Sequence, residues 1–263
     1  MLQFLKLGGS LITVKDKPYT LRQGILQQAA SEVHAYLSSH PGNSLIIGHG
    51  SGSFGHTSAA TYGTKNGVSS QEEWLGYAHV CRDARALNQH VLNALVDAGV
   101  PAVSYPPSSA VRCSNGDMVE WDTSSIKQAI QNGLVPLIFG DTVLDDRLGG
   151  TICSTEDLFL WLGRRFSPKR VLIAGIEPGV WEDFPARRTM MKEIHASKFK
   201  EGSDFITGSH FTDVTGGMAA KVQRMSSMVQ ENPGCKVLLF TGIPKGAIQN
   251  ALASDIPGTT ILP

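Results

Sequence analysis

Short apolar runs, rich in Val, Ile and Leu, recur along the chain, and most of them lack a strict alternation of polar and apolar residues. Runs of this kind are typical of strands that are buried on both faces of a sheet. Six strands are predicted in this way, at Leu2–Leu7, Leu45–Gly48, Ala102–Tyr105, Val135–Phe139, Arg170–Ala174 and Lys236–Phe240.

Between these runs, apolar residues recur at helical spacing. The first such stretch places Ile25, Ala29, Val33 and Leu37 on one stripe. Four helices are predicted, at Leu21–Leu37, Gln71–Ala98, Glu156–Arg165 and Met218–Gln230. Strands that alternate with helices are typical of an α/β fold, so the pattern predicts a parallel or mostly parallel sheet between helices.

Local signals mark several element boundaries. Ser70 followed by Glu73 predicts a capping box at the start of the second helix, and Thr20 is the predicted N-cap of the first. The segment Asp145–Gly150 ends in two glycines, which supply the positive φ angles of tight turns, and it predicts a hairpin. The chain that these signals divide into elements contains no internal repeat and no obvious linker.

Composition narrows the class of protein. The 263 residues are 41% hydrophobic and 17% charged, as in a compact domain with a large core. Lys plus Arg and Asp plus Glu both number 23, without runs of like charge, which argues against a nucleic acid partner. We therefore expect a single domain over residues 1–263, with an approximate boundary between two lobes near residue 166.

The location of the protein is predicted from its cysteines and apolar segments. The four cysteines are far apart and form no C-x-x-C pair, which is typical of free thiols in a reducing compartment, so we expect a cytoplasmic protein. The apolar N-terminus is interrupted by Lys6 and lacks the basic region of a signal peptide. No segment approaches the roughly 20 apolar residues of a membrane span, so no membrane partner is expected.

Candidate chemistry begins at the end of the first predicted strand, with the sequence K-L-G-G-S. Gly8, Gly9 and Ser10 can expose successive backbone N–H groups to an anion, and Lys6 adds a positive charge beside them. The alternative is an ordinary turn with a solvated lysine. Lys15 follows in a polar stretch, for which a solvated loop without a ligand is also a possible interpretation.

A second candidate, G-H-G-S-G-S-F-G-H, follows the second predicted strand. A loop this dense in glycine lets the backbone approach a phosphate at the carboxyl end of a strand, through Gly50, Ser51, Gly52 and Gly55. The spacing imitates a Walker A loop with His56 in place of its lysine, which argues against a P-loop NTPase. His56 can instead donate a hydrogen bond to a phosphate monoester, or it can pack locally.

Acidic residues follow the later strands. Gly140 and Asp141 come directly after the fourth predicted strand, and Glu156 and Asp157 open a predicted helix. These carboxylates could orient catalytic lysines or hold a metal ion, but Asp and Glu are also ordinary residues of a first helical turn.

The last candidate site opens the fourth predicted helix, at D-V-T-G-G-M-A-A-K. Thr215, Gly216 and Gly217 can present free N–H groups and the positive end of the helix dipole to a phosphate, and Asp213 precedes them. Lys221 lies one turn later, close enough to join them.

Taken together and in this order, the motifs K-L-G-G-S, G-H-G-S-G-S-F-G-H, G-D and D-V-T-G-G-M-x-x-K resemble those of the amino acid kinase superfamily. The F-G-H ending is similar to the isopentenyl phosphate kinase and fosfomycin kinase families within it. The resemblance implies a three-layer αβα sandwich, usually dimeric. It places the acceptor in the lobe of residues 1–165, and ATP with Mg²⁺ in the lobe of residues 166–263.

The resemblance also implies roles for individual residues. Lys6 and Lys15 would contact the transferring phosphoryl group, with Gly8 and Gly9 shaping that loop, while Lys221 would bind the ATP phosphates. The loop from Gly50 to His56 would hold the acceptor phosphate.

Two motifs depart from the pattern of the superfamily. Its S-G-D is replaced by S-T-E, so the acid that orients the lysines would be Glu156 or Asp157. The nucleotide-side motif resembling T-D-V-D-G-V-Y becomes A-G-I-E-P-G-V-W, which keeps Gly179 but replaces Tyr with Trp181, and Gly175 begins it.

The function that the resemblance implies is transfer of the ATP γ-phosphoryl group to isopentenyl phosphate, a small-molecule phosphate substrate. No general base is required, because a phosphate monoester with a second pKa of about 6 is already largely dianionic. An apolar pocket with Tyr77, Ala78, Cys81 and Ile138 would favour a prenyl tail. The alternatives are a fosfomycin-type kinase, another amino acid kinase, and a non-catalytic nucleotide- or oxyanion-binding protein. No protein ligand for a metal ion is predicted.

Overall fold

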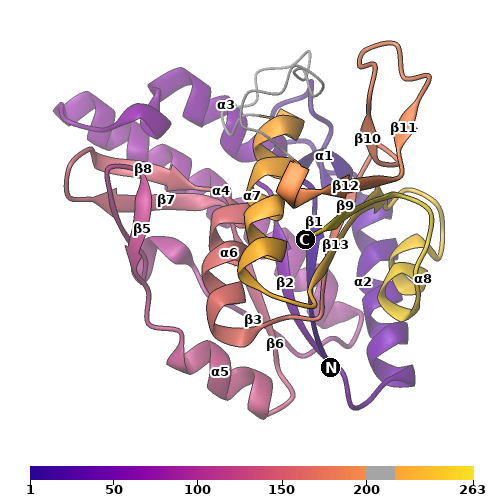
Figure 1. Cartoon of the computed structure of the whole chain (residues 1–263). Coiled ribbons are helices and arrows are strands. Elements are labelled where there is room, and N and C mark those ends of the chain that lie inside the picture. Colours follow the sequence, from indigo (N-terminus) through magenta and orange to yellow (C-terminus); the bar gives the residue numbers. More distant parts are fainter. Residues whose placement is uncertain (199–216) are drawn as a thin grey trace.

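The apolar runs form the centre of one large sheet. The computed structural model describes residues 1–198 and 217–263, and its main sheet has eight strands in the order β12-β14-β13-β9-β1-β2-β6-β3 (Figure 1). In chain order these strands are β1 (Leu2–Leu7), β2 (Ser44–His49), β3 (Ala102–Ser104), β6 (Val135–Phe139), β9 (Arg170–Gly175), β12 (Glu193–His195), β13 (Lys236–Thr241) and β14 (Thr259–Leu262). Six neighbouring strands of this sheet, in the order β13-β9-β1-β2-β6-β3, run parallel to one another, and β14 runs antiparallel to β13. The predicted mostly parallel sheet is confirmed.

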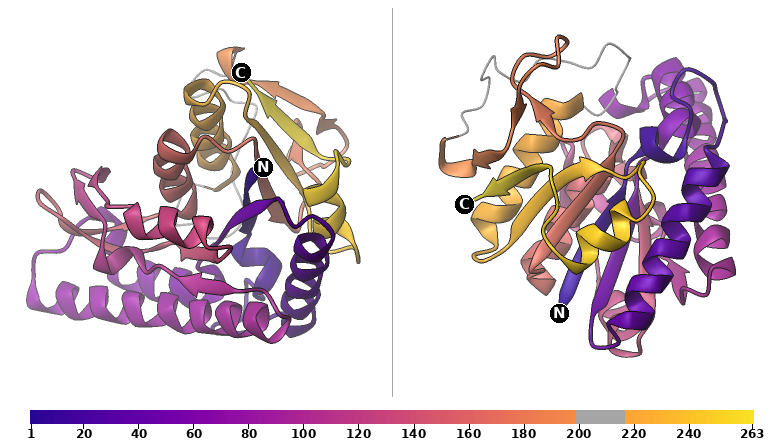
Figure 2. Two further views of the ribbon diagram at one scale, coloured as in Figure 1. Left: turned by 90° about the horizontal axis from the view of Figure 1, so that it is seen from below. Right: turned by 90° about the vertical axis from the view of Figure 1, so that its right-hand side faces the viewer.

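Helices cover both faces of this sheet (Figure 2). In chain order the helices are α1 (Gly9–Ile12), α2 (Gln23–Ser39), α3 (Gly52–Tyr62), α4 (Gln71–Asp97), α5 (Ser124–Gln131), α6 (Thr155–Phe166), α7 (Gly217–Glu231) and α8 (Ala247–Ala253). Short 3-10 turns lie at η1 (Thr64–Asn66), η2 (Pro107–Ser109) and η3 (Ala196–Lys198).

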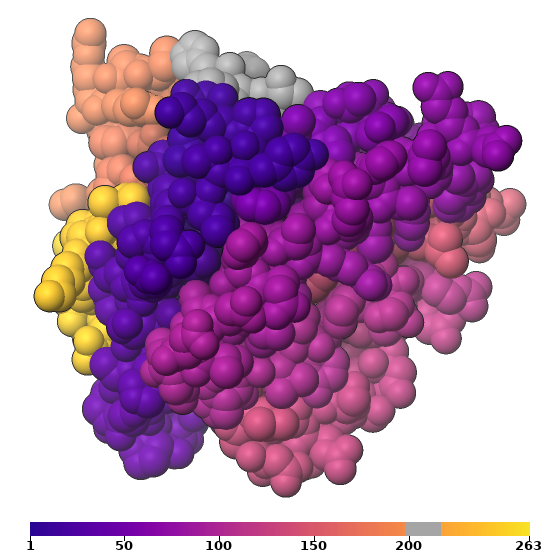
Figure 3. Space-filling model, turned by 180° about the vertical axis from the view of Figure 1, so that it is seen from behind, coloured from indigo at the N-terminus to yellow at the C-terminus, as the bar shows by residue number. Residues whose placement is uncertain are grey.

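Successive residues of a strand point to opposite faces, which divides the core in two. Phe4 of β1 packs on Phe159 of α6, with ring centroids 5.0 Å apart, in a cluster that includes apolar residues of α5, α6 and α7. The next residue, Leu5, belongs to a second buried cluster with residues of α2, α4 and α8. This is the predicted three-layer αβα sandwich. The face behind that of Figure 1 is made largely by the N-terminal half of the chain (Figure 3).

A smaller, separate sheet includes β7, which begins directly after Gly140 at the end of β6. It has the order β5-β4-β7-β8, with β4 (Arg112–Ser114), β5 (Asp117–Glu120), β7 (Asp141–Asp145) and β8 (Gly149–Cys153). Strands β7 and β8 form the predicted hairpin, in which Gly149 has φ +75°. A separate ribbon pairs β10 (Val180–Trp181) with β11 (Met190–Met191).

All ten predicted strands and helices have both ends within two residues of the observed ones, but one predicted helix cap is wrong. The capping box of Ser70 and Glu73 is present at the start of α4. The prediction that Thr20 caps the first predicted helix is wrong, because that helix, α2, begins at Gln23 and has no side-chain cap. The chain is held extended up to that point, since the Arg22 N–H donates to the Ile12 carbonyl at 2.8 Å.

The structure bears on two further sequence predictions, which concern the cysteines and the membrane-spanning segments. All four cysteines are free thiols, as predicted, and three of them are buried. Within residues 1–198 and 217–263, each helix is too short or too polar to cross a membrane.

Candidate active site

Four parallel strands of the main sheet end in glycine at the same edge. Gly8 follows β1, Gly50 follows β2, Gly140 follows β6, and Gly175 is the last residue of β9. All four line a cavity of about 380 Å³. Ligands of open α/β sheets bind outside the carboxyl ends of the strands, and glycine there lets a ligand approach the backbone closely. The basic and acidic residues that line this cavity are Lys6, Lys15, His56, Lys65, Glu156, Asp157, Lys221 and Arg224.

The loops after β1 and β2 touch each other through glycines. A Cβ on Gly9 would lie 2.5 Å from the Gly52 nitrogen, and a Cβ on Gly50 would lie 2.9 Å from the Gly9 nitrogen. Thr13 holds the two loops together, because its hydroxyl donates to the Gly9 carbonyl at 2.7 Å and accepts from the Ser53 N–H at 2.9 Å. Larger residues at these glycines would separate the two loops, so the local sequence determines the shape of the cavity floor.

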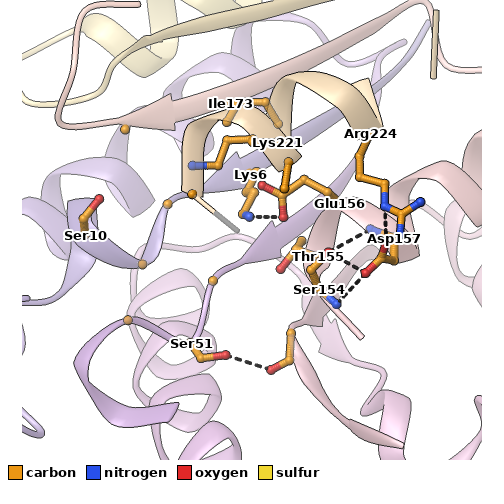
Figure 4. Close-up of a pocket in the computed structure, with 18 of the residues that line it drawn as sticks. Lys6, Ser10, Ser51, Ser154, Thr155, Glu156, Asp157, Ile173, Lys221 and Arg224 are labelled. Carbon is orange, nitrogen blue, oxygen red and sulfur yellow. Dashed lines mark hydrogen bonds and ion pairs between the residues drawn. The ribbon is translucent and has the colours of Figure 1, made fainter. Parts of the chain in front are cut away.

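The structure places His56 in helix α3 rather than in a loop. The helix already begins at Gly52, and the half-buried His56 lines the cavity from its second turn. Ser51, just before the helix, donates from its hydroxyl to the Gly140 carbonyl at 3.1 Å, which ties the end of β2 to the end of β6 (Figure 4).

His49, at the end of β2, has a structural place rather than a place in the cavity wall. It is fully buried, its ring stacks on Phe139 with centroids 5.4 Å apart, and its Nε2 lies 3.2 Å from the Asn88 Oδ1. Burial lowers the pKa of His49 to about 4. This side chain is therefore neutral at physiological pH and adds no charge to the cavity.

Lys6 and Glu156 form a buried ion pair at the centre of the cavity (Figure 4). Each side chain is only 7% exposed, and Lys221 on α7 lies nearby. Burial acts to raise the pKa of Glu156, but the charges of Lys6 and Lys221 outweigh it and hold the pKa below its usual value. Glu156 is therefore ionised and supplies the counter-charge for the lysines.

Asp157, the other acid considered from the sequence, is occupied elsewhere. Its carboxylate accepts from the backbone N–H and the hydroxyl of Ser154 in a capping box at the start of α6. It also forms an ion pair with Arg224, at 2.8 Å. Both contacts are visible in Figure 4. Of the two acids, the structure brings only Glu156 into contact with a lysine of the predicted set.

Several predicted residues lie outside the cavity lining. Asp141 is buried, accepts from the backbone N–H groups of Ser108 and Thr142, and has a pKa raised by burial. Trp181 donates from its indole nitrogen to Glu177 at 2.8 Å. Among the described residues predicted to bind phosphate or nucleotide, four do not reach the cavity wall, namely Gly55, Asp141, Gly179 and Trp181.

The remaining predicted residues either line the cavity, lie outside the described residues, or lie elsewhere in the fold. Ser10 and Lys15 line the cavity after β1, and Gly217 lines it at the start of α7. Asp213, Thr215 and Gly216 lie outside the described residues. The residues predicted for an apolar pocket do not line this cavity, so that prediction was wrong for Tyr77, Ala78, Cys81 and Ile138 alike. Ala78 is exposed to solvent, and Ile138 is buried in the core cluster of α5 and α6.

Two cations of the cavity were missed from the sequence. Arg224 lies one turn after Lys221 on α7, so helical spacing was a usable signal for it. Lys65 belongs to η1 and reaches the cavity only because this turn packs on β8, which no local pattern reveals. Among residues 1–198 and 217–263, no group of three His, Cys, Asp or Glu side chains is placed to hold a metal ion.

Comparison with known proteins agrees with this geometry. The family model described as the amino acid kinase family matches residues 1–241. The chain belongs to the amino acid kinase family. As a member of this family it is a kinase, and the fold and the enzyme class predicted from its sequence are confirmed.

Relatives of this amino acid kinase align over its whole length. The isopentenyl phosphate kinase of Methanocaldococcus jannaschii is 33% identical over 270 residues, which cover 99% of this chain and 98% of that protein. That of Methanothermobacter thermautotrophicus is 32% identical over 265 residues, which cover 98% and 97%. A solved structure of isopentenyl phosphate kinase superposes with a TM-score of 0.84 at 29% identity and covers 99% of this chain and 100% of that one.

Proposed function

We propose that this kinase transfers the γ-phosphoryl group of ATP to a phosphate oxygen of isopentenyl phosphate, forming isopentenyl diphosphate and ADP. The observation that carries the proposal is one cavity that holds His56 from α3, Lys6 from β1 and Lys221 from α7. The full-length similarity to isopentenyl phosphate kinases supports this choice of acceptor.

The charges of the cavity suit a reaction between two anions. Five Lys and Arg side chains line it against two carboxylates, which leaves three positive charges in excess among the described lining residues. An acceptor phosphate with a second pKa of about 6 reaches the cavity as a dianion. The main barrier is then to bring two anions together, and the residues contribute by charge neutralisation and positioning.

No proton needs to be removed from the acceptor. Its phosphate oxygen attacks the γ-phosphorus while the bond to the β-phosphate oxygen breaks, and ADP leaves with those electrons. Both carboxylates of the cavity are bound in ion pairs, Glu156 with Lys6 and Asp157 with Arg224. Such carboxylates are poor general bases, which fits a reaction that needs none.

We infer that the nucleotide phosphates bind between β9 and α7. Gly8 and Gly175 line this end. A Cβ on Gly8 would lie 2.8 Å from the Ala174 carbonyl oxygen, so the close packing here requires glycine. Gly217 and Lys221 line it from the first turns of α7. The observed residues fit a polyphosphate, and Lys221 would neutralise its charge. We propose that Mg²⁺ enters with the nucleotide, whose phosphate oxygens are suitable hard ligands.

The acceptor phosphate is assigned to the opposite end. Ser51, Gly52 and His56 lie there, beside Gly140. Ile152 lines the same end and packs with Ala59 and Val80 in a small buried apolar cluster. An apolar wall beside a phosphate site suits a prenyl phosphate better than it suits an amino acid.

The test is ADP release with a panel of acceptors, namely isopentenyl phosphate, dimethylallyl phosphate, fosfomycin and acetylglutamate. We expect the highest kcat/KM with isopentenyl phosphate. A higher value with fosfomycin would replace the proposed acceptor by a phosphonate. Silence with all four would contradict the proposal and favour a nucleotide- or oxyanion-binding role.

We further propose that residues 1–165 bind the acceptor, that residues 166–263 bind the nucleotide, and that the protein is a cytoplasmic homodimer. The division is supported by Gly175, Gly217 and Lys221, which come from the second segment. Sedimentation equilibrium of the purified chain tests the dimer, and a monomer at micromolar concentration would contradict it.

A further inference from the structure

Lys65 lines the cavity and adds to its positive charge, but the mechanism proposed above assigns it no contact with either substrate. It lies in η1, between α3 and α4, and its side chain is half-buried. Its ammonium Nζ donates to the Ile152 carbonyl oxygen at 2.7 Å. The position is supported a second time, because the Thr151 hydroxyl donates to the Lys65 backbone carbonyl at 3.0 Å. The amine is therefore attached to the end of β8 rather than free in solvent.

The segment around Lys65 is also fastened to the β7–β8 hairpin. The Val68 N–H donates to the Leu148 carbonyl at 2.7 Å, and a Cβ on Gly149 would lie only 2.1 Å from the Val68 carbonyl oxygen. Contacts from the middle of η1, at Lys65, and from just after its end, at Val68, fix its place on the hairpin. A cation held in this way loses little conformational entropy when it binds an anion.

The charge of Lys65 is not neutralised by any carboxylate of the described part of the chain. Lys6 is paired with Glu156 and Arg224 with Asp157, whereas the bonding partner of Lys65 is a neutral carbonyl. An ammonium has three N–H donors, and one of them is used by Ile152. Lys65 thus retains both its charge and donors for a ligand in the cavity.

The topology places Lys65 at the acceptor end. Strand order in the main sheet is β9-β1-β2-β6, so the nucleotide end at β9 is about three strand spacings, or about 14 Å, from β6. Lys65 is attached to Ile152, whose strand β8 pairs with β7, and β7 begins directly after Gly140 at the end of β6. Its neighbours in the cavity wall are accordingly the residues assigned to the acceptor.

We propose that Lys65 is an acceptor-binding residue, whose ammonium contacts the acceptor phosphate from the β8 wall while His56 contacts it from α3. This assignment rests on the proposed function, since it requires a phosphorylated acceptor. It gives the acceptor dianion a cation that no carboxylate competes for. It also places that cation beside the apolar Ile152, where the polar head and the apolar tail of a prenyl phosphate would meet.

The test uses Lys65→Gln in the full chain, with isopentenyl phosphate and ATP as substrates. Glutamine can still donate to the Ile152 carbonyl but carries no charge. Losing a charge-assisted hydrogen bond should raise the KM for isopentenyl phosphate about ten- to a hundredfold. The KM for ATP should stay within about twofold, because the nucleotide binds elsewhere. Lys65→Arg keeps the positive charge, so its rise in the KM for isopentenyl phosphate should be much smaller.

Lys127→Met is the matched control, since Lys127 is an exposed lysine of α5 and its loss changes the net charge equally. An unchanged KM for isopentenyl phosphate in Lys65→Gln, with wild-type turnover intact, would overturn the role of Lys65 and leave the proposed function standing. Equal rises in both KM values together with a lower melting temperature would mean that Lys65 is structural. Turnover of acetylglutamate alone by the wild type would overturn both proposals.

Discussion

Lys6 of β1 and Glu156 of α6 are 150 positions apart in the chain, yet they form the buried ion pair at the centre of the cavity. Breaking a buried pair on one side leaves an uncompensated charge, which is strongly destabilising. If Glu156 is removed, the remaining charge of Lys6 would lie near a further cation, because Lys221 also acts on Glu156 electrostatically. The pair therefore affects both stability and catalysis.

Glu156→Gln should lower the free energy of unfolding by about 3 kcal/mol or more. It should also lower kcat on the order of a hundredfold, because Lys6 loses the group that orients it. Urea unfolding and steady-state kinetics measure the two effects. The matched control is Glu120→Gln, which removes one carboxylate of a surface pair with Arg112, both 63% exposed. Wild-type kcat in Glu156→Gln would remove Glu156 from the mechanism.

The same pair predicts how stability depends on pH. The pKa of Glu156 in the folded protein lies below its usual value of 4.5. Its contribution to stability is therefore complete above the unfolded pKa and is lost as the pH falls through the lower folded pKa. The difference in unfolding free energy between wild type and Glu156→Gln should shrink steadily from pH 6 to acidic pH. A difference that is constant over this range would contradict the assignment.

His56→Ala should impair the acceptor side selectively. Loss of a hydrogen bond to a charged group should raise the KM for isopentenyl phosphate at least about tenfold and lower turnover. The fold should survive, because a half-buried side chain at the cavity wall is removed rather than a core residue. His195→Ala, at an exposed histidine of β12, is the control. Near-normal kinetics of His56→Ala toward isopentenyl phosphate would exclude His56 as the phosphate ligand.

Gly9→Ala should disrupt the cavity floor. The added Cβ would lie 2.5 Å from the Gly52 nitrogen, a contact that requires the loops after β1 and β2 to separate. We expect a loss of kcat/KM of at least about a hundredfold, since small misplacements of catalytic groups are costly. Gly42→Ala is the control, because a Cβ there meets no atom within 4 Å. Equal activities of the two variants would show that the close approach of the loops is dispensable.

Much of the fold could be predicted because its causes are local. Buried parallel strands require continuous apolar runs, and the run at Val135–Phe139 became β6 without a shift of either end. Ser70 and Glu73 form their capping box through contacts three residues apart. The glycine-rich loop beginning at Gly50 could be assigned to a ligand-binding edge because it directly follows a strand. Thr20 failed as a cap because a distant contact, from Arg22 to Ile12, decided where α2 begins.

The sequence by itself determined the layered α/β architecture, the glycine loops at the strand ends and the lysines near them, since each is written in neighbouring residues. Only the tertiary structure decided between Glu156 and Asp157, which look equivalent in the first turn of α6. Glu156 meets Lys6 from another strand, whereas Asp157 is taken by Ser154 and Arg224. It likewise directed Asp141 away from the cavity and brought Lys65 to its wall. Such choices depend on side chains from distant segments, which folding alone brings within bonding distance.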